Sequence, residues 1–553
     1  MNPRATSILP AFCVCFAFAA APSSAQELLV ELPNPTPTVK RFGHSIDRIG
    51  DVDQDGIEDF AVGAPGLYAP DNDSGCVHVF AGGSGALLWS IQPPALHGHF
   101  GWAVSGAGDV DADGWGDLVV GAPRTGSNFD GSVYVYSGRT HALLHSDTGT
   151  PFAYFGYAVD GLGDVDLDGH DDWIAGTQIG NQTTYTGFAR VYSGATGNVL
   201  YTYAGSATSD YLGRAVSRAG DVDLDGHADF LIGSFGRFVR LHSGATGALL
   251  REILPPSPGF VHFGVALAGG FDVDLDGSPD FVVGDPEYGV YSGRATLYSG
   301  STGAILGGFQ SSDFTQNEPI GFGQSLAMGE DSDGDGVADW AGGTASFNFS
   351  VAVTVSGSGP TRIHEVAGKQ FTDFFGAGVA LYDFDSDGAT DTLYGATQVT
   401  NGAGYVRILG GGVDLPEPYC TAKTTGSNCH PTLYYTGVPS LSAANPFRLR
   451  VSFANPGVPG MLFYGYAPAA LPFGGGYLCV GLPLKRTVVQ VAGGQPTTCG
   501  GTFAFDFTAH AGSGVDPNLV AGVDVYAQYW FRDSISPSGP VDTTNGLRFT
   551  LRP

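Results

Sequence analysis

Short apolar segments separated by glycine-rich polar loops recur as one unit, seven times, along the first three quarters of the chain. Each unit begins with an anchor dipeptide, and an acidic run follows eight or nine residues later. Next come an apolar run such as residues 60–62, an alternating segment such as residues 131–138, and a closing apolar stretch such as residues 86–89. The anchors are Phe42-Gly43, Phe100-Gly101, Phe155-Gly156, Leu212-Gly213, Phe263-Gly264, Phe322-Gly323 and Phe375-Gly376.

This order of segments predicts four short strands in each unit. The anchors lie 51 to 59 residues apart, a length typical of the blade of a β-propeller. An elongated β-solenoid is the alternative, but solenoid coils are shorter and do not need four strands each. We therefore predict an all-β chain, a seven-bladed β-propeller with a C-terminal β-sandwich domain.

The two ends of the repeat region predict how the ring closes. The seventh unit stops after its alternating segment, residues 404–412, and lacks a fourth strand. An unused apolar stretch, residues 27–32, precedes the first anchor at about the interval expected for a fourth strand. Because closure leaves few free sheet edges, we expect this N-terminal strand to complete the last blade.

The acidic runs have the pattern of a metal-binding loop. Carboxylates at positions 1, 3, 5 and 9, with glycine at position 6 for a sharp turn, can surround one hard cation, and the carbonyl of position 7 adds another oxygen. Converging carboxylates repel by roughly 4 kcal/mol per pair at 4 Å and an effective dielectric of 20, which a cation relieves. Asx turns without metal are the alternative.

We predict about seven Ca²⁺ sites, because calcium suits flexible, all-oxygen coordination. The predicted metal ligands are Asp51, Asp53, Asp55, Ile57 and Asp59; Asp109, Asp111, Asp113, Trp115 and Asp117; Asp164, Asp166, Asp168, His170 and Asp172; Asp221, Asp223, Asp225, His227 and Asp229; Asp272, Asp274, Asp276, Ser278 and Asp280; Asp331, Asp333, Asp335, Val337 and Asp339; and Asp383, Asp385, Asp387, Ala389 and Asp391.

An EF-hand is the rival interpretation of these loops. It requires a glutamate at position 12, where the first loop has Val62, and its flanks are helices rather than strands. The side chains of His170 and His227 stand at position 7, where only the backbone oxygen would bind metal, and we expect them to face solvent.

The anchors, the acidic loops and the Gly-Ala-Pro that follows the apolar run together resemble FG-GAP repeats, as in the β-propeller of integrin α subunits. The resemblance covers roughly residues 27–413. It implies that the acidic loops lie on one face of the propeller, and that ligands meet the opposite face.

The formal charge of −30 follows largely from these loops. Seven loops of four aspartates hold 28 of the 54 acidic residues, and seven bound dications would reduce the charge to −16. Nucleic acid is excluded as a partner, since phosphate binding needs clustered Lys and Arg.

Residues 1–25 have the pattern of a signal peptide: Arg4, then an apolar region from Ile8 to Ala21, then a small-residue cleavage site. No other stretch is apolar enough for a transmembrane helix. We predict a secreted or cell-surface protein with the propeller at residues 26–413, a linker at 414–418 and a β-sandwich at 419–553.

The C-terminal region holds four cysteines, which an oxidising compartment would pair. Cys420–Cys429 and Cys479–Cys499 is the preferred connectivity of the three that are possible. Cys76 is expected to be a buried small hydrophobe. This region loosely resembles C-terminal modules of exported bacterial (planctomycete-type) surface proteins, for which no activity is implied.

Two functions are compatible with these features. The first is non-catalytic binding or adhesion, with an unidentified extracellular protein or glycan as ligand; candidate contacts are Tyr68, Phe129 and Tyr185 in the longer loops. The second is a polysaccharide lyase or hydrolase, since a fold does not fix a function. The sequence holds no HExxH and no GxSxG motif, and the pair His97 and His99 fits a polar loop better than a catalytic metal site. We therefore expect no enzyme activity.

Overall fold

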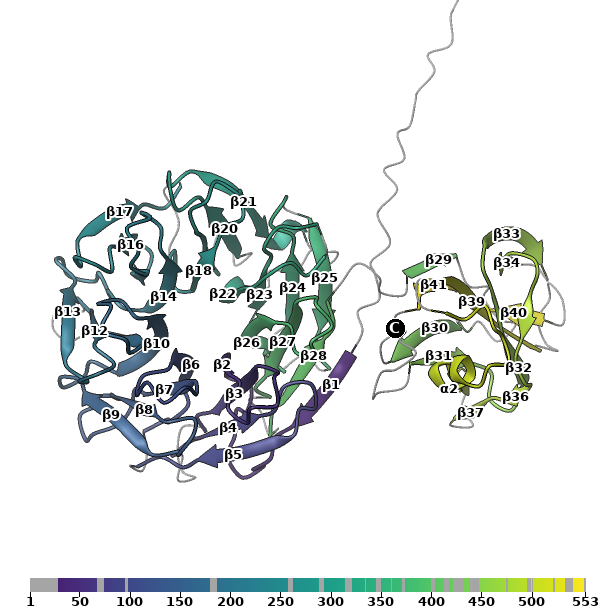
Figure 1. Cartoon of the computed structure of the whole chain (residues 1–553), viewed down its shortest axis with the longest axis horizontal. Helices are drawn as coiled ribbons and strands as arrows, with labels where there is room; N and C mark the ends of the chain where they lie inside the picture. Colours follow the sequence, from purple (N-terminus) through teal and green to yellow (C-terminus); the bar gives the residue numbers. More distant parts are fainter. Residues whose placement is uncertain are drawn as a thin grey trace, which may run out of the picture.

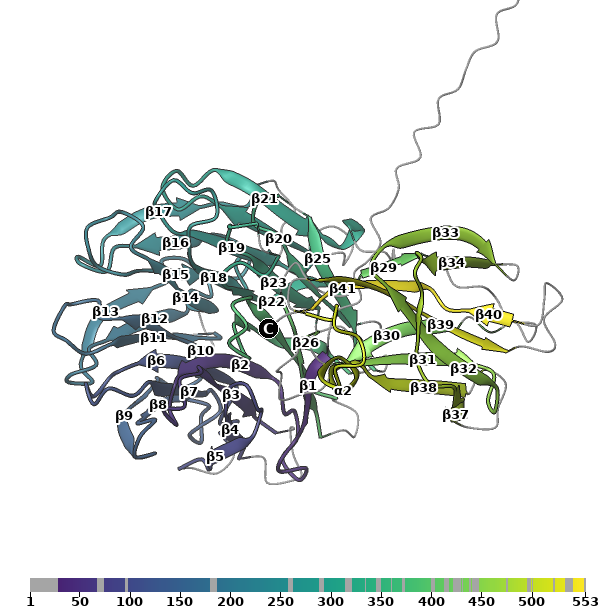
Figure 2. The same ribbon diagram turned by 45° about the vertical axis from the view of Figure 1, so that its right-hand side comes forward.

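In the computed structural model the chain forms β-strands almost throughout, in two groups (Figures 1 and 2). The structure describes residues 28–551 except 67–73, 95–97, 180–185, 257–261, 288–292, 314–320, 334, 345–349, 360, 370–372, 399–402, 412–416, 421–428, 430, 437–438, 440–446, 474–475, 495–498, 500, 521–522 and 533–540. The predicted signal peptide, Tyr68 and Tyr185 lie outside these residues.

Seven four-stranded antiparallel sheets make up the first group, and their first strands surround a central axis (Figure 1). Blades one to three are β2 (Ser45–Gly50), β3 (Asp59–Ala64), β4 (Cys76–Phe80) and β5 (Leu87–Ile91); β6 (Ala103–Gly108), β7 (Asp117–Ala122), β8 (Ser132–Tyr136) and β9 (Leu143–Thr148); and β10 (Phe155–Gly163), β11 (Asp172–Thr177), β12 (Phe188–Tyr192) and β13 (Val199–Ala204).

Blades four to six continue the same order. They are β14 (Ala215–Gly220), β15 (Asp229–Gly233), β16 (Val239–His242) and β17 (Leu249–Ile253); β18 (Leu267–Phe271), β19 (Asp280–Asp285), β20 (Arg294–Tyr298) and β21 (Ile305–Gln310); and β22 (Phe322–Met328), β23 (Trp340–Thr344), β24 (Val351–Val355) and β25 (Arg362–Ala367). The 3₁₀-helix η1 (Ser311–Asp313) follows β21.

The seventh blade joins the two ends of the ring. It contains β26 (Phe375–Tyr382), β27 (Asp391–Ala396), β28 (Tyr405–Leu409) and, as its outer strand, β1 (Leu28–Pro33). β1 pairs antiparallel with β28, with Glu31 opposite Arg407 and Leu32 opposite Val406. The N-terminal strand therefore supplies the fourth strand that the seventh repeat lacks. A closed ring of blades excludes the solenoid.

Burial is greatest in the second strand of each blade and falls toward the rim, and the first strands, which face the axis, are only partly buried. Every residue of the second strands is buried, for example in β3 and β7, because neighbouring blades cover both faces. Fourth strands such as β9 alternate between exposed and half-buried residues, because only one face packs on the blade.

The anchor dipeptides lock each blade to the one before it. The anchor side chain is buried, and the glycine has a positive φ, 82° at Gly101. The carbonyl of Gly101 lies only 2.1 Å from where a Cβ at Gly63 would stand, so both blades need glycine at the contact. Later repeats change the Ala-Pro of Gly-Ala-Pro but keep this first glycine.

The C-terminal strands form a β-sandwich of two main sheets. One sheet holds β29 (Glu417–Cys420), β41 (Gly546–Thr550), β39 (Asp524–Arg532), β32 (Pro459–Gly465) and β35 (Lys485–Arg486), with β36 (Gln490–Val491) and β40 (Val541–Thr543) at its margins. The other holds β30 (Thr432–Thr436), β31 (Arg448–Ala454), β38 (Gly501–Asp506) and β37 (Gly493–Gly494). The hairpin β33 (Pro468–Phe473)–β34 (Gly476–Val480) and helix α2 (Phe507–Gly512) complete it.

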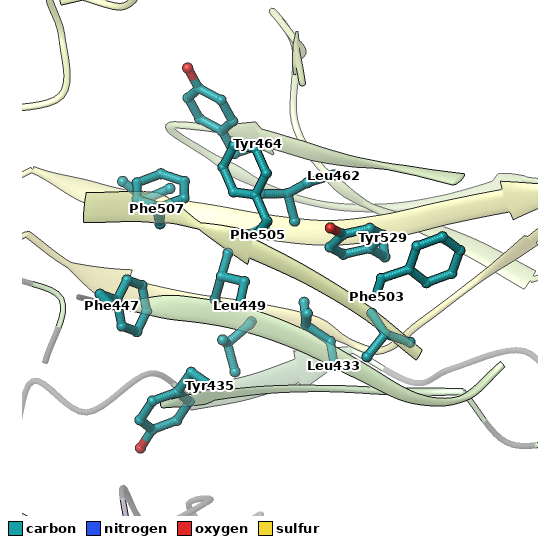
Figure 3. Packing of buried hydrophobic residues seen from close by; sticks show 14 of the residues in the cluster. Leu433, Tyr435, Phe447, Leu449, Leu462, Tyr464, Phe503, Phe505, Phe507 and Tyr529 are labelled. Carbon is teal, nitrogen blue, oxygen red and sulfur yellow. The ribbon is translucent and has the colours of Figure 1, made fainter. Parts of the chain in front are cut away.

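Aromatic and aliphatic side chains fill the space between the two sheets (Figure 3). Leu449 of β31 and Tyr529 of β39 are fully buried there, one from each sheet. β29 starts at Glu417, so the last two residues of the predicted linker already pair with β41 in the sandwich.

The predicted disulfide connectivity is wrong. Cys429 is bonded to Cys499, which excludes both Cys420–Cys429 and Cys479–Cys499. The reason is topological: Cys429 precedes β30 and Cys499 precedes β38, and these strands flank β31 in one sheet. Cysteines 70 residues apart are thus brought within 5.4 Å between Cα atoms. Cys76 is buried and free, as expected.

Candidate metal centre

The seven acidic loops connect the first and second strands of each blade. In the first blade, residues 51–59 run from the end of β2 to the start of β3. The anchor precedes β2 and the loop follows it, so anchors and acidic loops lie at opposite ends of the inner strands. A strand of six residues spans about 20 Å, which separates the two faces of the propeller.

Aspartates at positions 1 and 5 shape the loop around their own backbone. In all seven loops the two oxygens of position 1 accept hydrogen bonds from the amides of positions 5 and 6, at 2.9–3.2 Å and 2.8–2.9 Å. Position 5 accepts one from the amide of position 7, at 2.9–3.1 Å. These are Asx-type turns, and they draw the loop into a ring.

The aspartate at position 9 fixes the loop to the rest of the blade. In every loop its Oδ2 accepts a hydrogen bond from the backbone amide of position 2, at 2.6–2.9 Å. Its Oδ1 accepts a hydrogen bond from a glycine amide just after the third strand, such as that of Gly82 or Gly138, at 2.7–3.0 Å. Position 9 is therefore a structural residue whether or not a cation is bound, a role that the sequence pattern alone did not reveal.

In the first five loops, carboxylates also converge on one point. Asp51, Asp53 and Asp59 present oxygens within 4.8 Å of one another, and so do the corresponding aspartates 109/111/117 and 164/166/172. In the fourth and fifth loops the groups are 221/223/225 and 272/274/276, and two further groups of this kind are present. In each of these five loops, three of the four predicted aspartates are thus brought together.

The second loop shows that this arrangement fits a cation. Asp111 Oδ1 is buried and has no hydrogen-bond partner among the described residues. Burial, followed by the charges of Asp113 and Asp109, raises the pKa of Asp111. A buried, unpartnered anionic oxygen is costly, and a hard cation with oxygen preference would satisfy it.

Burial also disfavours the ionised form of the aspartate at position 9. It raises the pKa of Asp59 to about 6 and the pKa values of Asp117 and Asp172 to about 7, although the backbone amides act in the opposite direction. The pKa of Asp391 is raised well above its ordinary value by burial and then by Asp385. A divalent cation in the loop would restore the ionised form of these groups.

The prediction that His170 and His227 face solvent is wrong: both side chains are half-buried, and each imidazole contacts the preceding loop. The imidazole Nδ1 of His170 lies 2.7 Å from the carbonyl of Val110, and that of His227 lies 2.7 Å from the carbonyl of Val165. Ser278 donates to the carbonyl of Val222 at 2.6 Å. Each of these carbonyls belongs to position 2 of the preceding loop, so the second to fifth loops are linked one to the next.

The other sequence candidates contribute little here. His97 lies outside the described residues and His99 is buried beside Trp102, with ring centroids 6.0 Å apart. Phe129 is 37% exposed; it stacks on Tyr154 and lies under the guanidinium of Arg124, at 5.3 Å. It therefore remains a candidate contact residue, on a different part of the blade from the acidic loop.

We expect two aspartates of the second loop to respond differently to alanine substitution. Asp111→Ala removes a ligand repelled by its neighbours, so the melting temperature in EDTA should change by less than about 1 °C while one bound calcium is lost. Asp117→Ala leaves the amides of Val110 and Gly138 without an acceptor, which costs about 3 kcal/mol and about 4 °C even in EDTA.

Differential scanning calorimetry in EDTA, with a metal count by atomic emission, measures both effects. Equal loss of stability in the two variants would contradict this division of roles.

Comparison with known proteins agrees with the repeat pattern. The FG-GAP repeat family matches residues 42–80 and 100–136. Integrin alpha-IIb of Homo sapiens is 34% identical over 161 residues, which is 26% of this chain and 15% of that protein. Integrin alpha-5 of Xenopus laevis is 28% identical over 215 residues, 35% of this chain and 20% of that protein.

The chain thus carries FG-GAP repeats and resembles the propeller of integrin α subunits. The matches span no more than a fifth of the length of these two relatives. Among the described residues, no helix has both the length and the apolar character needed to cross a membrane.

Proposed function

We propose that this FG-GAP propeller is an exported, calcium-binding, non-catalytic protein that binds an extracellular protein or glycan at or outside the cell surface. The observation that carries the proposal is the set of seven identically folded acidic loops on a propeller similar to that of integrin α subunits. The similarity supports adhesion, and the sequence of residues 1–25 supports export.

In this proposal calcium has a structural role. Each loop is bonded to the turn that follows the third strand of its own blade, as at Gly194. In the third to fifth blades the loop also contacts the preceding loop. A cation in the loop would hold these contacts together by neutralising the carboxylates. Side-chain oxygens would come from the four aspartates of each loop, which in the first loop are Asp51, Asp53, Asp55 and Asp59. The residue at position 7 would supply its backbone carbonyl.

The test is binding of the purified chain to glycan and matrix-protein arrays, in 1 mM CaCl₂ and in EDTA. We expect saturable binding that EDTA abolishes, with the ligand recovered intact. Absence of binding to either array in calcium would refute the proposed function, and shortening of a polysaccharide ligand would show an enzyme instead.

A further inference from the structure

The anchor end of the propeller holds a cavity of about 470 Å³ around the central axis. The residue directly after each anchor dipeptide lines it, so every blade contributes one side chain to the wall. These residues are His44, Trp102, Tyr157, Arg214, Val265, Gln324 and Ala377. The volume is within the range of small-molecule sites in proteins.

Seven aliphatic side chains, again one from each blade, form the floor of this cavity. They also line a second cavity of about 160 Å³ deeper along the axis, so they separate the two spaces. The floor residues are Ile46, Val104, Val159, Val216, Leu267, Leu326 and Val379. A ligand in the outer cavity would therefore rest on an apolar surface.

The wall is chemically different on its two sides. Blades one to four contribute three aromatic rings and one cation that follow one another around the wall. The ring centroids of His44 and Trp102 are 4.4 Å apart, and those of Trp102 and Tyr157 are 5.4 Å apart. The guanidinium of Arg214 lies 4.2 Å from the ring centroid of Tyr157. Blades five to seven contribute the uncharged Val265, Gln324 and Ala377. The cavity therefore has one aromatic and cationic side.

The charge of the cavity is opposite to that of the protein. The net charge of the chain is −30, yet no Asp or Glu occurs among the described residues that line the cavity. Burial lowers the pKa of His44 to about 3, so that imidazole is neutral at physiological pH. The positive charge of the lining therefore comes from Arg214.

Arg214 has no carboxylate within ion-pair distance in the described part of the chain, and its buried Nε has no hydrogen-bond partner there. A deeper arginine of blade four, on the strand β14 that begins directly after Arg214, behaves differently. Arg218 lies 3.4 Å from Asp47 and 3.7 Å from Asp160. Ser105 Oγ lies between these carboxylates, 2.6 Å from Asp47 and 2.8 Å from Asp160, and donates its one proton to either of them. The inner arginine is neutralised within the protein, whereas the outer one is available to a ligand.

We propose that this cavity binds a saccharide that carries a carboxylate, with the carboxylate on Arg214 and the apolar face of the sugar ring against Trp102 and Tyr157. This inference rests on the proposed binding function and names its ligand class. Arginine holds carboxylates through paired N–H donors, and half-buried aromatic rings beside an apolar floor suit a pyranose ring.

The surrounding negative charge favours a ligand with few acidic groups. A strongly polyanionic ligand would be repelled by a protein whose net charge is −30, or −16 with seven bound dications, whereas a single carboxylate reaches the one cationic position of the lining. The cavity lies about 20 Å from the acidic loops, so metal would act on it only by holding the blades in place.

The experiment measures affinity by isothermal titration calorimetry in 1 mM CaCl₂ with two matched pairs of probes: trigalacturonate and its methyl ester, and sialyllactose and lactose. At least one acidic probe should bind about tenfold more tightly than its neutral partner. Arg214→Gln should lower that affinity about tenfold, Arg214→Lys should restore part of it, and Trp102→Ala should weaken both members of the pair.

Arg237→Gln is the matched control. Arg237 is an exposed arginine of the same blade, it pairs with Asp210 at 3.2 Å, and it does not line the cavity, so its loss should leave binding unchanged. Melting temperatures of all variants within about 2 °C of the parent would show that the fold is intact.

Three results would overturn the inference: no binding of either acidic probe, equal binding by the parent and Arg214→Gln, or binding of a glutamate-rich peptide in place of the saccharides. If the arrays yield a calcium-dependent ligand whose affinity Arg214→Gln does not change, the proposed function stands and this site is wrong. If the arrays yield no ligand, the proposed function itself fails.

Discussion

Removal of calcium with EDTA is expected to lower the melting temperature of the propeller by about 12 °C. Extracellular calcium modules have dissociation constants near 10⁻⁴ to 10⁻³ M, so at 1 mM calcium a site at the tighter end adds about 1.4 kcal/mol. Seven such sites add about 10 kcal/mol. The entropy of unfolding of about 390 residues is roughly 0.8 kcal/mol per degree. Dividing the free energy of calcium binding by this entropy gives a shift in melting temperature of about 12 °C.

The repeated geometry is the physical basis of this expectation. In each loop the position 9 carboxylate is buried, and in the first three loops the carboxylates of positions 1 and 3 lie beside it. Without a cation their repulsion is relieved only by opening the loop or by protonation. Opening would break the bonds that tie the loop to the next turn and, at His170 and His227, to the preceding blade.

Calorimetric scans in 1 mM CaCl₂, in EDTA, and after calcium is added back measure this shift. Addition of 1 mM MgCl₂ in place of calcium is the control and should restore only a small part of it, because magnesium demands rigid octahedral coordination. A melting temperature that EDTA does not move would rule out a stabilising metal.

Deletion of residues 26–35 is expected to open the ring and lower the melting temperature by at least about 6 °C. The deletion removes β1 and its pairing with β28, buried Leu32, and the two carbonyl contacts that Asn34 Nδ2 makes, to Val39 and Ala403. It also removes Glu31, which pairs with Lys369 and with Arg407. Burial of one leucine and several ladder bonds together contribute about 5 kcal/mol.

Leu32→Ala provides a milder version of this test that keeps the strand in place. It should cost about 2–3 kcal/mol, because Leu32 packs into the core between blades seven and one. The matched control is Leu87→Ala in β5, the corresponding outer strand of blade one, where the side chain is 46% exposed. If the deletion, measured in calcium, melts with the parent protein, β1 does not close the ring.

The sequence predicted the features that depend on local spacing. The anchors, the acidic loops and the missing fourth strand of the last repeat are all set by residues close together in the chain, and repetition made each pattern visible seven times. The pairing of β1 is not local, because β1 pairs with a strand more than 370 residues away. It could still be predicted, because the repeat pattern indicated that the last blade lacked a fourth strand.

The features that the sequence did not predict depend on the arrangement of whole elements. The Cys429–Cys499 bond follows from the order of strands in one sheet of the sandwich, which spacing cannot reveal. The His170 and His227 contacts cross from one blade to the next. The wall of the cavity at the anchor end combines one residue from each of seven blades. Arg214 therefore joins the other wall residues only when the ring is closed.

The most direct test of this account is the number of calcium ions bound by the purified chain. Equilibrium dialysis against 1 mM CaCl₂, followed by atomic emission, measures it, and the Asp111→Ala variant should bind one ion fewer. We expect about seven ions per chain, one for each acidic loop. A count of one or none, in a protein that is folded by circular dichroism, would contradict it.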